Sequence, residues 1–497
     1  MTMDITYTCI NSKYGQSRCN LMPRPTLSLL SRDEREILHE KALILLENIG
    51  VAIDDQRTLD ILKSAGLSYE KGRVKFPRDV VEWALRKTPK EVNLYSRDGK
   101  PYATLSGDTV LFNPGSAASG ILDYKSTDPR EPLLEDLFKF SLVVEYLENI
   151  HLQSTALIPY DVPIELRDRI RLYPILKVSR KPIITGAFTI DGVIDMLKML
   201  EVVIGDPGKK PLAVFDVCPS PPLKWSRITI SNLVDCAKRG IPIEIIPMPQ
   251  LGATAPATIG GALIQHHAEA LSGITIAQLV NPGSPIIYGG SPCILDMRYG
   301  SLLITTPETL LVATAYVELA KHFSLPTHTY MCLSDTRLID FQAGVESSIG
   351  ALVATLRKIN VVSGPGMIET ENVQSLEKLV LDDDVCGYAL RYSRGFNLDL
   401  ESIDVIEHVV NKGKTFLSHR HTLRTFRFEH YFPKVFNRYL KSTWYTRGKP
   451  SILEIAHEQV MELLKKAEPI YLDPDVERSL SKLVKNIGRK YGYEVEL

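Results

Sequence analysis

The sequence predicts an α/β protein built around a closed (β/α)8 barrel. Eight short apolar runs, each ending in Gly, Pro or polar residues, alternate with stretches of helical periodicity over residues 109–363. Continuous apolar runs are typical of parallel strands buried on both faces, and eight such units match the usual size of a closed barrel. An open doubly wound sheet is the alternative. The lack of a GxGxxG after the first run and of a long interruption favours the barrel.

The strands and helices can be placed one by one. We expect strands over Thr109–Asn113, His151–Pro159, Pro182–Phe188, Leu212–Val217, Pro242–Pro247, Pro285–Tyr288, Thr327–Cys332 and Asn360–Ser363. Seven helices are expected between them, over Leu134–Glu148, Ile164–Val178, Asp191–Val203, Lys224–Arg239, Ala257–Leu279, Pro307–Phe323 and Phe341–Arg357. Thr306-Pro307 is a favourable helix start, with Thr as the cap and Pro in the first turn.

Residues 1–105 predict a mixed cap that precedes the barrel. Ser31 and Glu34 form a capping-box pattern before a helix that ends at Gly50. The other elements expected here are helices over Gln56–Ala65 and Arg78–Lys87 and a hairpin over Val92–Tyr102 that turns at Asp98-Gly99.

The pattern changes after the barrel, which we assign to residues 106–380. Residues 381–497 predict a helical extension that packs on the barrel. It opens with the acidic run Asp382–Asp384, interpreted as a solvated loop. Amphipathic helices are expected over Ile403–Val410, Ile452–Lys465 and Val476–Asn486.

Composition excludes several classes of function. The charges nearly balance, with 58 Lys+Arg against 59 Asp+Glu and no basic stripe, so we expect no nucleic-acid partner. No apolar run reaches the length of a membrane span. The first 20 residues have no apolar core and predict no signal peptide. Seven scattered cysteines without a CxxC pair argue against a disulfide framework. Together these features predict a cytoplasmic protein without a membrane partner.

The active site of a barrel lies at the carboxyl ends of its strands, so the candidate residues are those at the predicted strand ends. Aromatic side chains that face one cavity can hold a quaternary ammonium by cation–π attraction. Four rings fall at predicted strand ends, although each could instead pack the barrel rim. They are Tyr160, Phe188, Tyr288 and Tyr330.

Glycines and polar residues complete the list of candidates. Glycines at the strand ends allow close approach of a bulky ligand to the backbone; they are Gly115, Gly289, Gly290, Gly364 and Gly366. His328 and Asn113 are candidate polar contacts. A metal site is the alternative, with His328, Cys332 and Glu269 as ligands. No spacing demands such a site, and at least one of the adjacent His266 and His267 is interpreted as an ordinary helix residue. We expect no bound metal.

Three blocks of sequence resemble the trimethylamine methyltransferase family. They are Pro249–Thr258 continued by Gln265–Glu269, Ser334-Asp335 followed by Asp340–Glu346, and His419–Arg427. The likeness extends from about residue 30 to the end of the chain. It implies a barrel enzyme that moves a methyl group from an amine to Co(I) of a corrinoid protein. The sequence contains only the twenty standard residues, which implies the branch without pyrrolysine. Known members of that branch demethylate quaternary amines such as betaines.

The resemblance also implies the partners. The chain lacks the Asp-x-His-x-x-Gly signature of corrinoid proteins, so the cobalamin is expected on a separate protein that docks at the barrel mouth, near the glycines named above. The His419–Arg427 block is expected at the mouth or the corrinoid interface, or as part of a packed cap. A homo-oligomer is expected as well.

For a betaine substrate, the carboxylate needs an anchor, and a guanidinium can grip it with two hydrogen bonds. Arg337 is the first candidate and Arg298 the second. Glu269 and Glu369 are candidates to face the ammonium, and Gln265 lies in a family block beside them. Two other functions stay open: a metal-dependent barrel lyase or methyltransferase, and a non-catalytic amine-binding protein.

Overall fold

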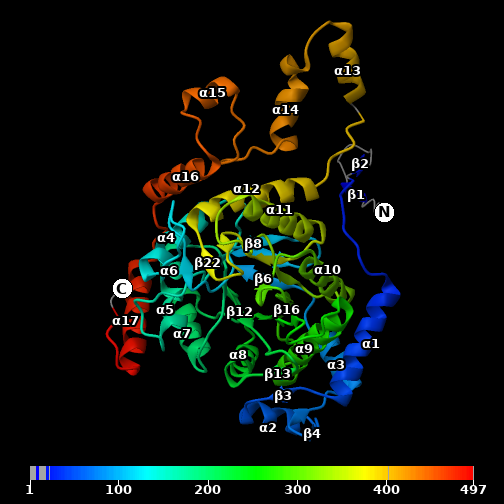
Figure 1. The fold of residues 1–497 in the computed structure, drawn as a ribbon, viewed down its shortest axis with the longest axis vertical. Helices are drawn as coiled ribbons and strands as arrows, with labels where there is room; N and C mark the ends of the chain where they lie inside the picture. Colours follow the sequence, from blue (N-terminus) through cyan, green and yellow to red (C-terminus); the bar gives the residue numbers. More distant parts are fainter. Residues whose placement is uncertain (1–6, 11–17, 22, 401, 496–497) are drawn as a thin grey trace.

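The computed structural model describes residues 7–10, 18–21, 23–400 and 402–495. The stretch 1–20, for which the sequence predicts no signal peptide, lies largely outside these ranges. The centre of the molecule is a barrel of eight parallel strands (Figure 1). Each strand lies within one of the eight predicted runs. They are β8 (Leu111–Asn113), β10 (Gln153–Ser154), β11 (Ile183–Thr185), β12 (Ala213–Val217), β14 (Ile243–Ile245), β16 (Ile286–Tyr288), β19 (His328–Tyr330) and β20 (Val361–Ser363).

The strands close into a circle in chain order. Parallel pairing runs from β10 through β11, β12 and β14 to β16, and from β19 through β20 to β8. A parallel bridge between Tyr288 and Thr327 joins β16 to β19. Between β8 and β10, the amides of His151 and Leu152 donate to the carbonyl of Phe112 at 2.8 and 3.1 Å. Closure confirms the predicted barrel and excludes the open sheet.

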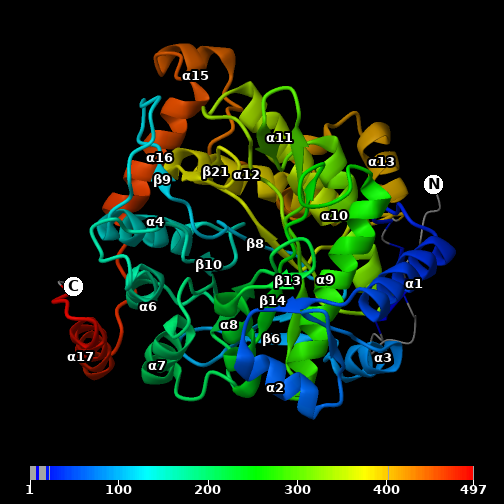
Figure 2. The same cartoon turned by 60° about the horizontal axis from the view of Figure 1, so that its bottom comes forward.

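Helices surround the barrel (Figure 2). Thr306 caps α10 and Pro307 occupies its first turn, as predicted. The seven predicted helical stretches are helical, although the second is divided into α5 and α6. The helices are α4 (Leu134–Tyr146), α5 (Arg167–Ile170), α6 (Leu172–Val178), α7 (Gly192–Ile204), α8 (Arg227–Lys238), α9 (Ile259–Val280), α10 (Pro307–His322), α11 (Phe341–Leu356) and α12 (Leu376–Ser393).

The N-terminal part closes the amino end of the barrel. Val92, Leu94 and Leu105 of the hairpin form one buried cluster with inward-facing residues of the strands, Leu111, Leu152, Ile184, Val214, Ile287 and Val361. The predicted capping box of Ser31 and Glu34 is present. The elements of this part are α1 (Arg32–Asn48), α2 (Gln56–Ser64), α3 (Arg78–Lys87), β6 (Val92–Tyr95), β7 (Pro101–Leu105) and the short strands β1 (Tyr7–Ile10), β2 (Arg18–Leu21), β3 (Ala52–Ile53), β4 (Tyr69–Glu70) and β5 (Arg73–Val74).

Short additional strands lie at the carboxyl end of the barrel, each in the segment that follows one of the barrel strands. One small sheet joins the segments after β8 and β20, and another joins the segments after β14 and β16. The first sheet consists of β9 (Gly120–Ile121), β21 (Met367–Ile368) and β22 (Val373–Gln374). The second consists of β15 (Gln250–Leu251), β17 (Cys293–Asp296) and β18 (Ser301–Leu303). A further short strand, β13 (Lys224–Trp225), pairs with β3 of the N-terminal part. Because the hairpin closes the amino end, a ligand would reach the barrel interior from the carboxyl end.

The acidic run is buried, so the predicted solvated loop is wrong. Asp382, Asp383 and Asp384 lie inside α12, the eighth barrel helix, and are 1–2% exposed. Each carboxyl has its own donors: the ammonium of Lys378 for Asp382, the amide of Asn149 for Asp383, and backbone amides 434–436 for Asp384. A buried charge is tolerated when it is paired in this way. The boundary predicted at 380/381 falls within α12, and we propose that the barrel unit extends to Ser393.

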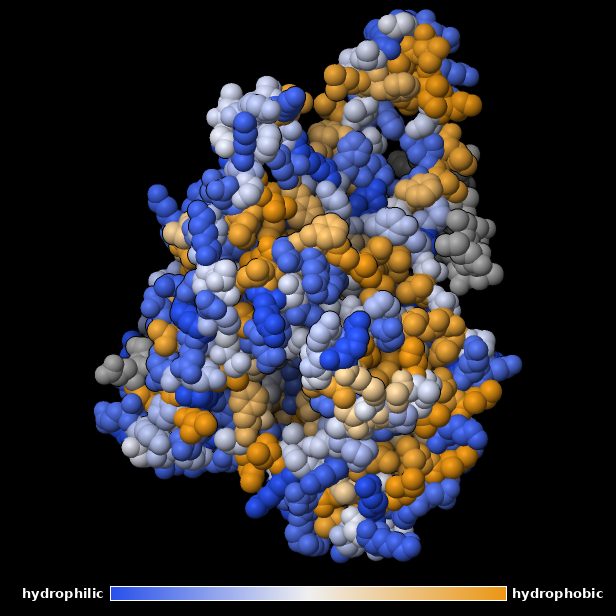
Figure 3. Space-filling model, viewed as in Figure 1, coloured by the Kyte–Doolittle hydropathy of each residue, from blue (hydrophilic) through white to orange (hydrophobic). Residues whose placement is uncertain are grey.

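The C-terminal part first leaves the barrel and then returns to it. α13 (Ser402–Asn411) and α14 (Arg420–Glu429) project from the molecule (Figure 1), and apolar side chains such as Ile403, Ile406 and Leu423 are exposed there (Figure 3). The chain returns to the barrel with α16 (Ile452–Lys466) and α17 (Pro474–Lys490). At the end of α17, Nζ of Lys490 lies 3.6 Å from Oδ2 of Asp195 on α7. The predicted helices of this part are confirmed. The 3-10 turn η1 (Phe416–Ser418) and α15 (Lys441–Thr446) complete it.

Candidate functional site in the barrel lumen

Polar side chains face the interior of the barrel above the apolar cluster. In parallel strands, side chains two residues apart point to the same side. Since Leu111, Val214 and Val361 point inward, the residues two positions later do so as well. Strand register then places Glu244 beside Asp216, and His328 beside Val361. The inward polar set is Asn113, Asp216, Glu244, His328 and Ser363.

Asp216 and Glu244 form a carboxyl pair in the centre of this set. They are direct neighbours on β12 and β14, and each carboxyl shifts the pKa of the other. Oδ1 of Asp216 and both carboxyl oxygens of Glu244 have no hydrogen-bond partner among the described residues. Glu244 is fully buried. The side chain of Asp216 is partly exposed to solvent, although Phe215 and Val217 on either side of it are buried. That exposure opens into the lumen.

Burial governs the ionisation of the pair. Desolvation raises the pKa of Asp216 to about 7, and desolvation together with the charge of Asp216 raises the pKa of Glu244 well above its usual range. Like charges at this distance disfavour ionisation of both groups at once. Near neutral pH the pair therefore holds at least one proton when no cation is present.

His328 lies beside the pair as a neutral group. Its Nε2 is 3.8 Å from a carboxyl oxygen of Glu244 and 3.0 Å from the hydroxyl of Ser363. Ser363 in turn is hydrogen bonded to Asn113. Desolvation lowers the pKa of His328 to about 3, so the imidazole gives the carboxyls no counter-charge. Nδ1 of His328 has no hydrogen-bond partner among the described residues.

A third acid, Glu371, lies at the mouth on a turn with unusual backbone geometry. Glu369, Thr370 and Glu371 adopt φ values of 52°, 53° and 69°, which non-glycine residues seldom adopt. Hydrogen bonds hold the turn: Thr370 Oγ1 donates to Asp335 at 3.0 Å, and Ser291 Oγ donates to Glu371 at 2.8 Å. Desolvation raises the pKa of Glu371 to about 8. The fold therefore keeps a carboxyl in the mouth at an energetic cost, which is typical of functional sites.

The raised pKa of Glu371 predicts a pH-dependent stability difference. The unfolded chain loses this proton near pH 4.5 but the folded protein keeps it to about pH 8, so Glu371 destabilises the fold increasingly as pH rises through this window. We expect Glu371→Gln to be more stable than the wild type by about 1–2 kcal/mol at pH 8.5 and nearly equal to it at pH 5. Thermal unfolding of both proteins across this pH range measures the difference. Glu369→Gln, on the outer side of the same turn, is the control, and a difference independent of pH would contradict the prediction.

The cation nearest to the pair is Arg171, which is fully buried. Its guanidinium donates to the carbonyls of Asp168, Thr155 and Gly186, and the ring of Phe188 covers it at 4.3 Å. Gly186 faces Asp216, since a Cβ there would lie 3.5 Å from the Cβ of Asp216. Arg171 therefore carries a positive charge next to the acidic pair without a direct ion pair to it.

Of the predicted aromatic residues, only Tyr330 reaches the acidic pair. Burial, followed by the neighbouring carboxyls of Asp216 and Glu371, raises the pKa of its phenol. Phe188 is 45% exposed over Arg171, and Tyr160 stacks on Arg167 at 4.3 Å. Tyr288 points outward, where its hydroxyl bonds His267 at 2.9 Å. The four rings do not form a common cage.

The predicted ligands of a metal lie in different layers. His328 faces the lumen, whereas Cys332 contacts Cys386 of α12 with a sulfur–sulfur distance of 3.7 Å. Glu269 is on α9, where it accepts hydrogen bonds from the amide of Leu223 and from Gln265. His266 and His267 are both buried in the same helix layer. Within the described ranges, no group of three His, Cys, Asp or Glu side chains is arranged to hold a metal ion.

The arginines predicted to anchor a carboxylate lie outside the lumen. Arg337 is 82% exposed and pairs with Glu369 at 3.1 Å, and Arg298 is 78% exposed and pairs with Asp296 at 2.7 Å. An exposed, already paired guanidinium gains little from a further partner. Arg171 is the arginine that the fold brings close to the acidic pair.

The predicted glycines serve close packing of the protein itself. A Cβ on Gly289 would lie 2.9 Å from Nδ1 of His328, and one on Gly115 would lie 2.6 Å from the sulfur of Met367. Gly364 and Gly366 have φ values of 146° and 90°, and a Cβ at either residue or at Gly290 would also meet protein atoms. These glycines shape the rim, and their contact with a corrinoid stays a prediction.

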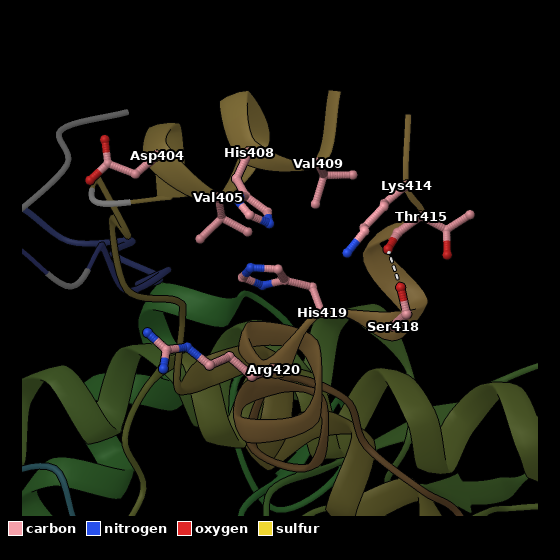
Figure 4. A pocket seen from close by; sticks show the side chains of 9 residues that line it. All are labelled: Asp404, Val405, His408, Val409, Lys414, Thr415, Ser418, His419 and Arg420. Carbon is pink, nitrogen blue, oxygen red and sulfur yellow. Dashed lines mark hydrogen bonds between the residues drawn. The ribbon is translucent and has the colours of Figure 1, made fainter. Parts of the chain in front are cut away.

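The His419–Arg427 block lies in the projecting part, away from the mouth. α14 is tethered to the carboxyl end of α12 through Arg391 and Glu429, and this end of a barrel helix is remote from the carboxyl ends of the strands. No described residue of α14 is buried, so the block is not a packed cap. A pocket beside it has the rings of His408 and His419 facing each other (Figure 4); it is lined by Asp404, Val405, His408, Val409, Lys414, Thr415, Ser418, His419 and Arg420.

Sequence reasoning missed Asp216, Glu244, Glu371 and Arg171. A signal existed for two of them, because Asp216 and Glu244 are single acids inside apolar strands, in LAVFDV and IPIEIIP. A charge is rarely fully buried unless it is paired or functional. Glu371 and Arg171 left no such signal, since both lie in connecting segments.

The profile of the trimethylamine methyltransferase (MTTB) family matches residues 11–491. The chain belongs to this family. It is 30% identical to a glycine betaine methyltransferase of Desulfitobacterium hafniense, over 95% of this chain and 99% of that protein. It is 28% identical to the trimethylamine methyltransferase MttB of Methanosarcina thermophila, over 90% of this chain and 95% of the relative. It is 29% identical to a proline betaine:corrinoid methyltransferase of Eubacterium limosum, over 82% of this chain and 87% of that protein.

The fold of this family chain is also found in a solved structure. The monomethylamine methyltransferase MtmB of Methanosarcina barkeri superposes with a TM-score of 0.52 at 14% identity, over 92% of this chain and 89% of that one. At this identity the likeness supports the fold alone. None of the helices in the described ranges is long and apolar enough to cross a membrane.

Proposed function

We propose that this protein transfers a methyl group from a quaternary amine to the Co(I) corrinoid of a separate protein. The observation that carries the proposal is the Asp216–Glu244 pair, which is buried at the carboxyl end of the barrel without a hydrogen-bond donor among the residues that the structure describes. Family membership and the similarity to betaine methyltransferases support the reaction type. We propose further that the protein acts as a cytoplasmic homo-oligomer.

The residues present fit this chemistry. A quaternary ammonium has no N–H group, so its binding site does not have to place hydrogen-bond acceptors around it. The site has to supply negative charge and a polarisable surface such as an aromatic ring. The carboxyl pair supplies the charge and Tyr330 supplies a ring next to it. The leaving amine departs neutral, so the reaction requires no general acid. The chain contributes positioning and a lumen closed to water at its amino end by the β6–β7 hairpin.

A betaine adds a carboxylate to the ammonium, and Arg171 is the cation nearest to the pair. Three of its N–H groups are used by backbone carbonyls, and a guanidinium has five. The lumen therefore presents opposite charges side by side, which complements a zwitterion. Neither alternative function has a specific observation in its favour, because the predicted metal ligands are separated and the relatives are named as methyltransferases.

The test is methylation of reduced cobalamin, or of a corrinoid protein, followed by visible spectroscopy. Glycine betaine, proline betaine and trimethylamine are the methyl donors to compare. We expect methylation with at least one quaternary amine and none with trimethylamine. Absence of methylation with every donor, using free cobalamin and then a corrinoid protein, would contradict the proposed reaction.

A further inference from the structure

We propose that a quaternary ammonium binds against Asp216 and Glu244 by displacing a proton held by this buried carboxyl pair. The inference deepens the proposed function and rests on it only for the choice of ligand. It makes amine binding a coupled exchange, in which a permanent cation enters the lumen and a proton leaves to solvent.

The first step of the argument is the state of the pair without ligand. Glu244 is fully buried, and neither of its carboxyl oxygens accepts a hydrogen bond from another described residue. Asp216 is its direct neighbour on β12 and likewise has an unpartnered oxygen. Independently of the acids, Nδ1 of His328 is buried without a hydrogen-bond partner among the described residues. Unpartnered buried polar atoms on two strands indicate that this part of the lumen is shaped for a ligand.

The second step is the chemistry of the incoming ligand. A protonated amine could donate N–H groups to the pair, but a quaternary ammonium cannot. Its attraction is electrostatic and is greatest when both carboxyls are ionised. A cation within a few ångströms favours the ionised form of an acid, and the effect is strong where water is excluded. The O–H bond of the protonated carboxyl breaks, the proton passes to the buffer, and the cation takes its place as counter-charge.

The third step concerns the other groups that face the pair. Arg171 approaches from the β10 side and already favours ionisation of Asp216. His328 and Tyr330 come from β19, Cys218 follows β12, and Glu371 closes the mouth. Desolvation lowers the pKa of His328 to about 3 and that of Arg171 to about 10, so at pH 7 His328 is neutral and Arg171 is charged. Glu371 is the other group that could release a proton near neutral pH, so the experiment must separate it from the pair.

Exchange of this kind would also explain how the products separate. When the methyl group leaves, the C–N electron pair stays on nitrogen and the amine becomes neutral. The ionised pair then has no counter-charge and takes a proton back from solvent. The reprotonated pair has little attraction for the tertiary amine, so product release is favoured without any movement of the barrel.

Isothermal titration with tetramethylammonium and with glycine betaine tests the inference. Titrations at pH 7 in buffers of different ionisation enthalpy give the number of protons exchanged per bound cation. We expect release of about 0.5–1 proton in the wild type and in Glu371→Gln. Glu244→Gln removes one of the two carboxyls that can hold the proton, so we expect proton release to fall below that of the wild type while the cation still binds.

Three results would overturn the inference: binding of the cation without proton release, release that disappears in Glu371→Gln but persists in Glu244→Gln, or no binding of either cation. The neutral isostere 3,3-dimethylbutanol is the matched ligand and is expected to bind weakly and to release no proton. These outcomes are separate from the methyl-transfer assay. Cation binding with proton release but no methylation would contradict the proposed reaction alone, and methylation without proton release would contradict only this inference.

Discussion

Replacing both acids of the pair, in Asp216→Asn/Glu244→Gln, is expected to lower kcat/KM for a quaternary amine by about 100- to 1,000-fold, or roughly 3–4 kcal/mol. The double variant leaves the lumen without the negative charge that holds the ammonium. The loss should appear mainly in KM. The positive charge is complete in the substrate and fades as the methyl group leaves, so the pair stabilises the bound substrate more than the transition state. Initial rates of corrinoid methylation over a range of amine concentrations measure both constants.

The fold of this variant should be intact. The two carboxyls have no hydrogen-bond donor from other described residues, and amides of the same shape avoid the cost of buried charge, so the thermal midpoint should be unchanged or higher. Glu201→Gln, an exposed acid on α7, is the control for loss of one charge at a distance. A loss confined to kcat, or a variant that unfolds, would indicate that the pair has a role other than substrate binding.

Replacing Asp384 with alanine should have the largest effect on stability. Its carboxylate accepts hydrogen bonds from the backbone amides of Lys434, Val435 and Phe436, and from the hydroxyl of Tyr431 at 3.1 Å. Alanine leaves these donors without an acceptor at a buried position, so we expect the free energy of unfolding to fall by about 3–5 kcal/mol. Thermal unfolding and trypsin cleavage within residues 397–450 measure the loss, because these contacts attach the returning chain to α12.

Asp404→Ala is the matched control for this variant, since Asp404 is an exposed acid on the projecting α13. It should leave both the thermal midpoint and the cleavage rate nearly unchanged. If Asp384→Ala behaved in the same way, the carboxylate would not be the group that holds residues 434–436 on the barrel.

Much of the architecture could be predicted because it depends on local patterns. The eight runs that predict strands are apolar throughout, and the capping residues Ser31 and Thr306 start helices as expected. α12 is the exception. Its three consecutive acids are typical of a solvated segment. They are buried because Lys378 of the same helix and two distant parts of the chain, Asn149 and residues 434–436, supply donors to them.

The candidate site could be predicted only in part. Asn113, His328 and Tyr330 lie at strand ends that face the lumen, and their contact with a substrate stays a prediction. Tyr288 has the same kind of position, yet it points into the helix layer. Strands that are buried on both faces carry no alternation of polar and apolar residues, so their sequence does not show which side chains point inward.

The sequence by itself determined that the chain is a β/α barrel and that it resembles one methyltransferase family, because strand and helix periodicity and family motifs are properties of the linear order of residues. Only the tertiary structure decided that Asp216 and Glu244 share the lumen with His328 and Arg171, and that Arg337 lies outside it. The physical reason is closure. The register between strands fixes which alternate side chains meet inside the barrel, and burial there sets their charge.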